Sequence, residues 1–187
     1  MILNGQSFCP ACGARLVERA LEGEGLVPYC EACAAFRFPQ YNVAVSMIVS
    51  DAATGKILLI QQYGRPFYIL VAGYVNRGES AEHAAAREIF EETGMTATRV
   101  RFNRTQFFEP SNTLMINFTA EVSDAAALHV NREIDCCAWF EPEAARANIK
   151  PGSLAARFLN AYLDGLAPEG GSDGTKRGRQ GDASQED

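Results

Sequence analysis

The sequence predicts an α+β fold preceded by a small metal-binding module. Several β-rich runs follow one another without a regular βαβ repeat, and two further runs carry helix caps or helical apolar spacing. Two paired-cysteine clusters lie near the N-terminus. We therefore expect three parts: the module at residues 1–38, a main domain at 39–166 and a disordered tail at 167–187.

The composition suits a globular protein of ordinary size. The chain has 187 residues and is 47% hydrophobic, enough for one domain with a real core and a small accessory module. Its formal charge is −6 and no block of Lys or Arg runs through the body, which argues against a protein held to nucleic acid mainly by phosphate contacts. No apolar run or signal peptide points to a membrane or to export, so we expect a cytoplasmic protein.

The N-terminal module is predicted to hold a structural zinc ion. Each C-x2-C loop turns two thiolates toward one point, and four sulfurs close a tetrahedral site with no position left for water. Two disulfides are the alternative pairing. The predicted ligands are Cys9, Cys12, Cys30 and Cys33.

The strands of the main domain are predicted from β-rich runs between turn residues. The runs YNVAVSMIVS and KILLIQQ, separated by DAATG, look like a hairpin that starts at Tyr41. Further strands are expected at residues 100–107, 114–122 and 134–140. The last of these contains Cys136 and Cys137, whose side chains face opposite ways, so at least one thiol is expected to be buried.

Two helices complete the prediction. Ser80 is a suitable N-cap and Gly94 a suitable residue after a helix end, so a helix is expected over residues 81–93. The run SLAARFLNAYL at 153–163 places its large apolar residues on one face and predicts a second helix. The tail has no aromatic residue and no aliphatic residue larger than Ala, which is typical of disorder.

Three carboxylates crowd the first of these helices. At about 100° per residue, Glu88, Glu91 and Glu92 project from one side, and each like-charge pair costs ~0.2–0.5 kcal/mol. Arg87 relieves part of this repulsion because it is the i,i+4 partner of Glu91. Taken alone, the cluster is best interpreted as a solvated acidic face.

The residues around these carboxylates match a longer pattern. The segment GYVNRGESAEHAAAREIFEETGM fits G-x5-E-x7-R-E-U-x-E-E-x-G-U at every fixed position, where U is a large aliphatic residue. This resembles the Nudix box of hydrolases that cut a diphosphate linked to another group, and it implies the Nudix fold, a mixed β-sheet between helices. The matching residues are Gly73, Glu79, Arg87, Glu88, Ile89, Glu91, Glu92, Gly94 and Met95.

Carboxylates suit the chemistry that the resemblance implies. A diphosphate is polyanionic, and the hard Mg²⁺ or Mn²⁺ ions that neutralise it take oxygen ligands. The general base would be Glu91 or a carboxylate outside the box, and Arg87 would orient a box glutamate such as Glu79. The implied metal ligands are the carboxylates of Glu88, Glu91 and Glu92 and the main-chain carbonyl of Ala72.

A zinc ribbon directly before a Nudix box is similar to the NADH pyrophosphatase subfamily. That subfamily hydrolyses NAD(H) to nicotinamide mononucleotide and AMP, and some members remove NAD caps from RNA. Its motif S-Q-P-W-P-F-P-x-S-L-M aligns with TQFFEPSNTLM at 105–115, in which most of the prolines are replaced. This segment determines specificity in the subfamily, so the resemblance implies the reaction class and leaves the preference for NADH open.

The resemblance also implies site residues outside the box. Glu133, six residues before Trp139, stands where the subfamily has a metal-binding glutamate, and an exposed strand residue is its alternative interpretation. Phe38 and Tyr74 match aromatic positions near the nucleotide and are equally compatible with core packing. The implied substrate contacts are Phe38, Tyr74, Gln106, Phe108, Thr113 and Ala155.

Several alternatives remain open at this level. Only eight residues precede Cys9, so the resemblance implies a shortened relative without the subfamily's N-terminal domain, and it implies a homodimer. Besides NAD(H) and NAD-capped RNA, the substrate could be ADP-ribose, FAD, a dinucleoside polyphosphate or a nucleoside triphosphate. A non-catalytic ligand-sensing or nucleic-acid-binding module is the other class, and the complete box argues against it.

Overall fold

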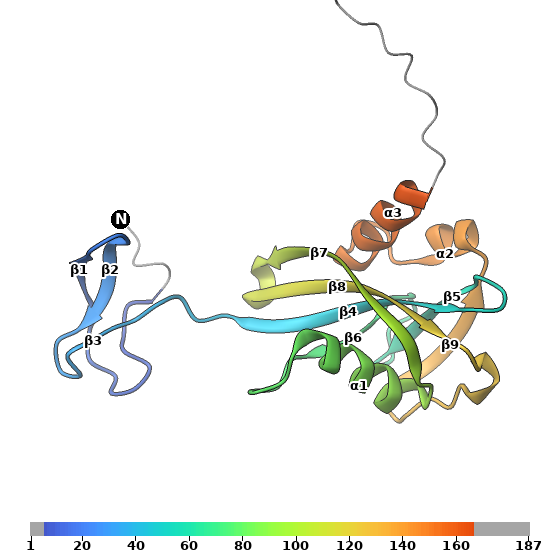
Figure 1. Ribbon diagram of the computed structural model, residues 1–187, viewed down its shortest axis with the longest axis horizontal. Helices are drawn as coiled ribbons and strands as arrows, with labels where there is room; N and C mark the ends of the chain where they lie inside the picture. Colours follow the sequence, from blue (N-terminus) through green and yellow to red (C-terminus); the bar gives the residue numbers. More distant parts are fainter. Residues whose placement is uncertain (1–5, 167–187) are drawn as a thin grey trace, which may run out of the picture.

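The computed structural model describes residues 6–166, which form a small sheet and a larger one (Figure 1). The small sheet is antiparallel and has three strands in the order of the chain: β1 (Val17–Leu21), β2 (Gly25–Cys30) and β3 (Ala35–Phe36). An extended segment at 37–41 connects it to the larger sheet. The tail at 167–187 lies outside the described residues.

The larger sheet is six-stranded and mixed. Its order is β7-β8-β4-β5-β9, and β6 also pairs with β4. The β4–β8 pair is parallel and the other pairs are antiparallel, which confirms the predicted mixed sheet. The strands are β4 (Asn42–Asp51), β5 (Ile57–Gln62), β6 (Val71–Tyr74), β7 (Ala97–Phe108), β8 (Thr113–Val122) and β9 (Ile134–Phe140).

The predicted hairpin forms only at its turn. β4 pairs with β5 at Ser50 and Ile57, and β6 takes the place next to β4 from Ala44 to Met47. The turn is closed by Asp51, whose carboxylate accepts a hydrogen bond from the main-chain N–H of Ala53 at 3.1 Å. The sequence did not predict β6, because four residues ending in Gly-Tyr carry little strand signal.

Helices lie on both faces of the larger sheet (Figure 1). α1 (Ala81–Thr93) has the predicted bounds: Ser80 Oγ accepts from the His83 N–H at 3.2 Å, and Gly94 ends the helix with φ of 70°. On the other face are α2 (Pro142–Asn148), which was not predicted, and α3 (Leu154–Leu166), which was. α3 extends three residues beyond its predicted end. Within residues 6–166 no helix combines the length and apolar character needed to cross a membrane.

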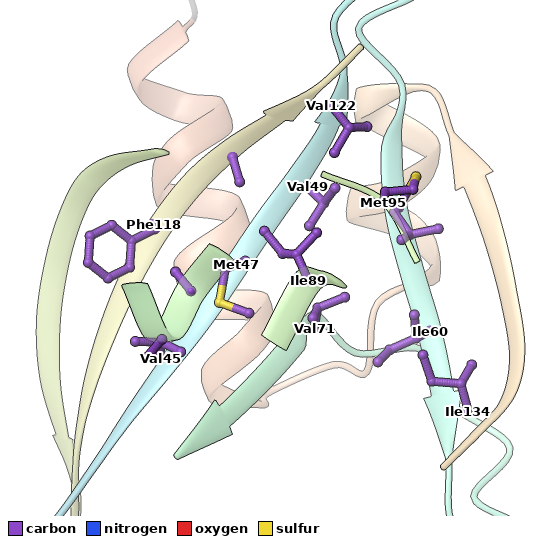
Figure 2. Close-up of a cluster of buried hydrophobic side chains, with 14 residues drawn as sticks. Val45, Met47, Val49, Ile60, Val71, Ile89, Met95, Phe118, Val122 and Ile134 are labelled. Carbon is purple, nitrogen blue, oxygen red and sulfur yellow. The ribbon is translucent and has the colours of Figure 1, made fainter. Parts of the chain in front are cut away.

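Two cores hold the sheet between these helices. Alternate residues of β4 point to opposite faces, so Val45 and Met47 pack with Ile89 of α1 (Figure 2), and Ile48 packs with Phe158 of α3. Two short 3₁₀ turns, η1 (Glu109–Ser111) and η2 (Ala125–Ala127), connect the outer strands. The box helix is therefore fixed on a sheet that is itself packed from both sides.

The two cysteines of β9 differ from the expectation. Cys136 is exposed and Cys137 is only partly buried, so neither thiol is fully buried. The physical reason is that β9 ends the strand order, and an edge strand is covered less completely than a central one.

Candidate metal centres

The four N-terminal cysteines come together at one point. Their Sγ atoms all lie within 4.8 Å of one another, with Cys12 and Cys30 at 3.5 Å and Cys9 and Cys33 at 4.0 Å. Sulfurs around a tetrahedral zinc with Zn–S bonds of ~2.3 Å would be ~3.8 Å apart, so the cluster fits zinc. Arg37 Nε donates to Cys9 Sγ at 3.2 Å and offsets part of the negative charge of a four-thiolate site.

A second cluster consists of carboxylates around a cavity of about 380 Å³, which we call the carboxylate cavity. Glu88, Glu91 and Glu92 reach it from α1, and Glu133 reaches it from the residue before β9. Glu133 is exposed, as its alternative interpretation expected, and yet it faces the same cavity as the box glutamates. Four predicted metal ligands are thus brought together from two separate segments.

Glu92 has the least favourable environment for a charged carboxylate among these four residues. It is 4% exposed, and its Oε1 accepts a hydrogen bond from Gln62 Nε2 at 3.1 Å while its buried Oε2 has no partner. Burial raises the pKa of Glu92 to about 7, and the neighbouring carboxylates of Glu88, Glu133 and Glu91 add to the effect. A buried oxygen without a partner, in a cluster of like charges, suits a hard cation.

Arg87 connects the box glutamates to one another. Its guanidinium forms a two-pronged contact with Glu79, with Nε–Oε1 at 2.8 Å and Nη2–Oε2 at 3.0 Å. Its Nη1 donates to Glu88 at 2.7 Å and to Glu91 at 2.9 Å, and its Nη2 donates to the carbonyl of Tyr74. Arg87 therefore directs these donors to the acidic cluster and to the main chain.

The same guanidinium sets the charge of Glu79. Hydrogen bonds from Arg87, and then from the Asn76 N–H, lower the pKa of Glu79 from 4.5 to about 2. In return, the hydrogen bond with Glu79 is the main cause that raises the pKa of Arg87 above its ordinary value. The pair is therefore charged at neutral and mildly acidic pH.

Gly73 explains why the box needs a glycine before the helix. A Cβ built at Gly73 would lie 1.9 Å from Cδ of Glu88, so the carboxylate of Glu88 rests directly on the backbone of β6. Only a residue without a side chain allows this approach. Ala72, the candidate carbonyl ligand, precedes it and lines the carboxylate cavity.

A neighbouring cavity of about 360 Å³, here called the apolar cavity, shares Tyr63 and Ala72 with the carboxylate cavity. Of the predicted substrate contacts, Phe108 and Ala155 line it. Tyr74 lines the carboxylate cavity, and Tyr74 and Thr113 both line a smaller hollow of about 200 Å³ to which Gly73 also contributes. Phe38 and Gln106 line none of these three cavities, so the structure brings together only part of the predicted set.

Tyr63 is a site residue that the sequence analysis missed. It is 68% exposed, has a left-handed backbone with φ of 56°, and donates from Oη to Oε2 of Glu133 at 3.2 Å. The loop is held by Asp135, whose Oδ2 accepts from the Gly64 N–H at 2.6 Å. A large residue in this conformation is strained and often marks a functional loop. The only signal in the sequence was the Tyr-Gly pair after a strand, which indicates a turn and no chemistry.

The sequence profile of the NUDIX domain matches residues 40–160. Curated relatives carry the name "NAD-capped RNA hydrolase NudC". The protein of Stutzerimonas stutzeri is 31% identical over 158 residues, which cover 83% of this chain and 55% of the relative. That of Vibrio cholerae is 27% identical over 87% of this chain and 59% of the relative. The chain thus spans less than two thirds of the length of these relatives, and they bear out the resemblance to the NADH pyrophosphatase subfamily.

Solved structures agree with the fold. A NUDIX hydrolase from Nitrosomonas europaea superposes with a TM-score of 0.57 at 21% identity, over 86% of this chain and 94% of that one. An Ap4A hydrolase from C. elegans gives a TM-score of 0.56 at 22% identity, over 66% and 98% of the two chains. At these identities the likeness concerns the fold alone, and it confirms the predicted fold class.

Proposed function

The chain belongs to the NUDIX domain family, and on this premise we propose that it hydrolyses the diphosphate bond of a nucleoside diphosphate derivative, with NAD(H) as the substrate. The products would be nicotinamide mononucleotide and AMP. The observation that carries the proposal is the carboxylate cavity, in which Glu92 keeps a buried oxygen without a partner. The names of the relatives support an NAD-type substrate over other diphosphates.

The carboxylate cavity suits a Mg²⁺ or Mn²⁺ ion. Bound there, such an ion would neutralise the diphosphate and make a bound water more acidic. Arg87 holds Glu88 and Glu91 in place for this role, and Gln62 holds Glu92. The ligands that we propose are the carboxylates of Glu88, Glu91, Glu92 and Glu133 and the carbonyl of Ala72.

The chain supplies the proton transfer with a carboxylate. Water attacks one phosphorus atom, the bond from that phosphorus to the bridging oxygen breaks, and two monophosphates leave. The proton of the water passes to Glu91, which Arg87 holds at 2.9 Å, or to Glu133, which the phenol of Tyr63 holds at 3.2 Å. Both carboxylates face the cavity.

The apolar cavity would take one of the two nucleoside halves. Its walls include the side chains of Phe108, Met115 and Phe158, which suit a flat ring. Two cations, Arg65 and Lys150, also line it, and Lys150 Nζ lies 4.0 Å from the ring centroid of Phe67. Because Tyr63 and Ala72 line both cavities, a ring in one cavity places its diphosphate in the other.

Two further assignments belong to this proposal. The thiol cluster would hold a structural Zn²⁺ through Cys9, Cys12, Cys30 and Cys33. A homodimer is supported by the subfamily resemblance and by the exposed aromatic side chains of Phe38 and Tyr41 between the two sheets. Light scattering should give twice the 20.3 kDa mass of one chain, and a single-chain mass at working concentration would contradict the dimer.

The proposed activity is tested with a substrate panel. NADH, NAD⁺, ADP-ribose, FAD, a dinucleoside polyphosphate and ATP are incubated with the protein and Mg²⁺ or Mn²⁺, and the products are separated by chromatography. We expect NADH or NAD⁺ to give nicotinamide mononucleotide and AMP faster than the other substrates react. If neither is cleaved at about 1 mM, near the upper end of ordinary KM values, the choice of NAD(H) is wrong.

A further inference from the structure

β7 carries three arginines on one face of the larger sheet. The β8 residues opposite them alternate with Phe118 and Ala120, which pack into the core on the α1 face. Since neighbouring residues of a strand point to opposite faces, the three arginines lie on the face covered by α3. The register pairs are Arg99 with Glu121, Arg101 with Thr119 and Arg104 with Asn117.

Two of these cations have no acidic partner. Arg99 forms an exposed ion pair with Glu121 at 3.5 Å. Arg101 and Arg104 are exposed, and within residues 6–166 neither forms a salt bridge. In a chain with a formal charge of −6, two arginines without an acidic partner beside a third on one strand face are a local excess of positive charge.

The row ends at Arg104, which lines a groove beside the apolar cavity. The groove has a volume of about 310 Å³ and lies between β7 and α3, with Arg104 of β7 and Tyr162 of α3 among its walls. Phe158 lines both the groove and the apolar cavity, and Phe108 at the end of β7 lines the apolar cavity. A chain that leaves the apolar cavity past Phe108 and follows β7 therefore reaches Arg104 at the groove.

On this geometry, and resting on the proposed function, we propose that the arginine face of β7 binds the RNA body of an NAD-capped RNA. A capped RNA continues from the adenosine half of the cap, so with that half in the apolar cavity its first nucleotides would reach from there to the groove. Arg104, Arg101 and Arg99 pair with successive phosphates, and the ring of Tyr162 offers a stacking surface for a base. The positive charge of this face favours a polyanion. The neighbouring apolar cavity, which would hold the adenosine of the cap, favours RNA over an acidic protein.

Binding, measured apart from hydrolysis, tests this surface. A fluorescein-labelled single-stranded RNA of about 12 nucleotides with a 5′ NAD cap is titrated with full-length protein without added divalent ions, at several salt concentrations. Compared with the wild type, the double variant Arg101→Gln, Arg104→Gln should bind roughly tenfold more weakly at low salt, and its log–log salt slope should be shallower by about 1.4, or ~0.7 per lost phosphate contact. Its melting temperature should stay that of the wild type, since both side chains are exposed.

Lys56→Gln is the matched control. It removes one positive charge at the turn between β4 and β5, where Lys56 forms only an exposed pair with Glu141 at 3.6 Å, and it should leave RNA binding unchanged. Equal affinity and salt slope in the wild type and the double variant would overturn the RNA surface, as would tighter binding of poly-glutamate than of RNA. The substrate panel is an independent test, because it measures hydrolysis and not RNA binding. Absence of NAD(H) cleavage would refute the proposed function, whereas equal binding by the wild type and the double variant would refute the RNA surface.

Discussion

The thiol cluster and the carboxylate cluster of this chain rest on very different supports. The buried core around the thiols consists of Cys9, Leu16 and Cys30, two of which are themselves proposed ligands. Three of the carboxylates stand on α1 and Glu133 directly precedes β9, with one core between α1 and the sheet (Figure 2) and another on the far face around Phe158. A zinc ion would therefore hold the fold of the ribbon, whereas a magnesium ion would act on a domain that folds without it.

The largest expected effect comes from neutralising one carboxylate, which tests whether the carboxylate cluster serves activity and not folding. Glu92→Gln keeps the shape of the side chain and its contact with Gln62, and it removes the negative charge needed for a cation. We expect NADH hydrolysis to fall by several orders of magnitude, about 10³-fold or more, because metal-dependent charge neutralisation is lost. Stability should hold or rise, since a buried carboxylate with an unpartnered oxygen is no longer forced to ionise.

The measurement pairs steady-state kinetics with a thermal melt. Glu143→Gln serves as the control, because that carboxylate is exposed and lies in a surface pair with Arg146. Near-normal turnover of the Glu92 variant would refute its place in the metal site. A large fall in melting temperature would instead show that this cluster, like the thiols, supports the fold.

Removal of zinc should have the opposite signature. A strong chelator, or Cys30→Ser, takes away the only substantial support of the small sheet, so the ribbon should unfold while the main domain keeps its cores. In an amide correlation spectrum, the signals of residues 6–38 should collapse to unfolded positions and those of 42–166 should remain dispersed. Loss of the edge contact between Tyr29 and Phe36, whose ring centroids are 4.9 Å apart, should also weaken the near-UV spectrum. Unchanged spectra in the zinc-free protein would mean that the ribbon folds without metal.

The same contrast explains how much the sequence could predict. Each cluster has local components, namely two C-x2-C loops and a single helix with its caps, and short-range spacing is enough to identify these. The bounds of α1 and the gathering of the four thiols agree with the prediction for this reason. The spacing of residues within a short segment cannot identify a contact partner that lies far away in the sequence.

The missed features all depend on such distant partners. β6 is a strand because it pairs with β4, and Tyr63 becomes a site residue because its loop meets Glu133, 70 positions later. The substrate contacts were assigned from a family motif, and the structure distributes them over neighbouring hollows, which are built from segments far apart in the chain. Phe38 precedes the larger sheet and lines none of the three cavities beside the carboxylates.

A methyl group added at Gly73 of β6 tests whether the carboxylate cluster needs the close contact between Glu88 and the β6 backbone. Gly73→Ala would place a Cβ 1.9 Å from Cδ of Glu88, so that carboxylate must swing away from the backbone. We expect the affinity for Mn²⁺, measured by calorimetry, to fall by about 10–100-fold, with a smaller effect on melting. Gly165→Ala is the control, because a Cβ there meets nothing within 4 Å. Equal metal affinities in the two variants would remove Glu88 from the ligand set.

A smaller effect is expected at Tyr63. Tyr63→Phe keeps the exposed ring at the junction of the two cavities and deletes the hydroxyl that donates to Glu133. The loss of one hydrogen bond should lower kcat/KM for NADH by about twofold to tenfold. If the hydroxyl only orients Glu133, kcat should fall with KM unchanged, and the double variant Tyr63→Phe, Glu133→Gln should be no slower than Glu133→Gln alone. Additive losses would show that the two residues act independently.

The last difference between the clusters lies in how acid affects them. Thiolate ligands bind metal less well as protons compete for sulfur, whereas Glu79 keeps its charge far into acid because Arg87 lowers its pKa from 4.5 to about 2. A lowered pKa in the folded state contributes stability that is complete above the unfolded value and is lost as the pH falls from about 4.5 to about 2.

Glu79→Gln removes this contribution. The variant should therefore melt below the wild type at pH 7 in thermal scans of the main-domain transition, and the two curves should converge toward pH 2. A constant gap between them across that range would show that Glu79 stabilises the loop before α1 by its shape and hydrogen bonds and that its charge contributes no stability.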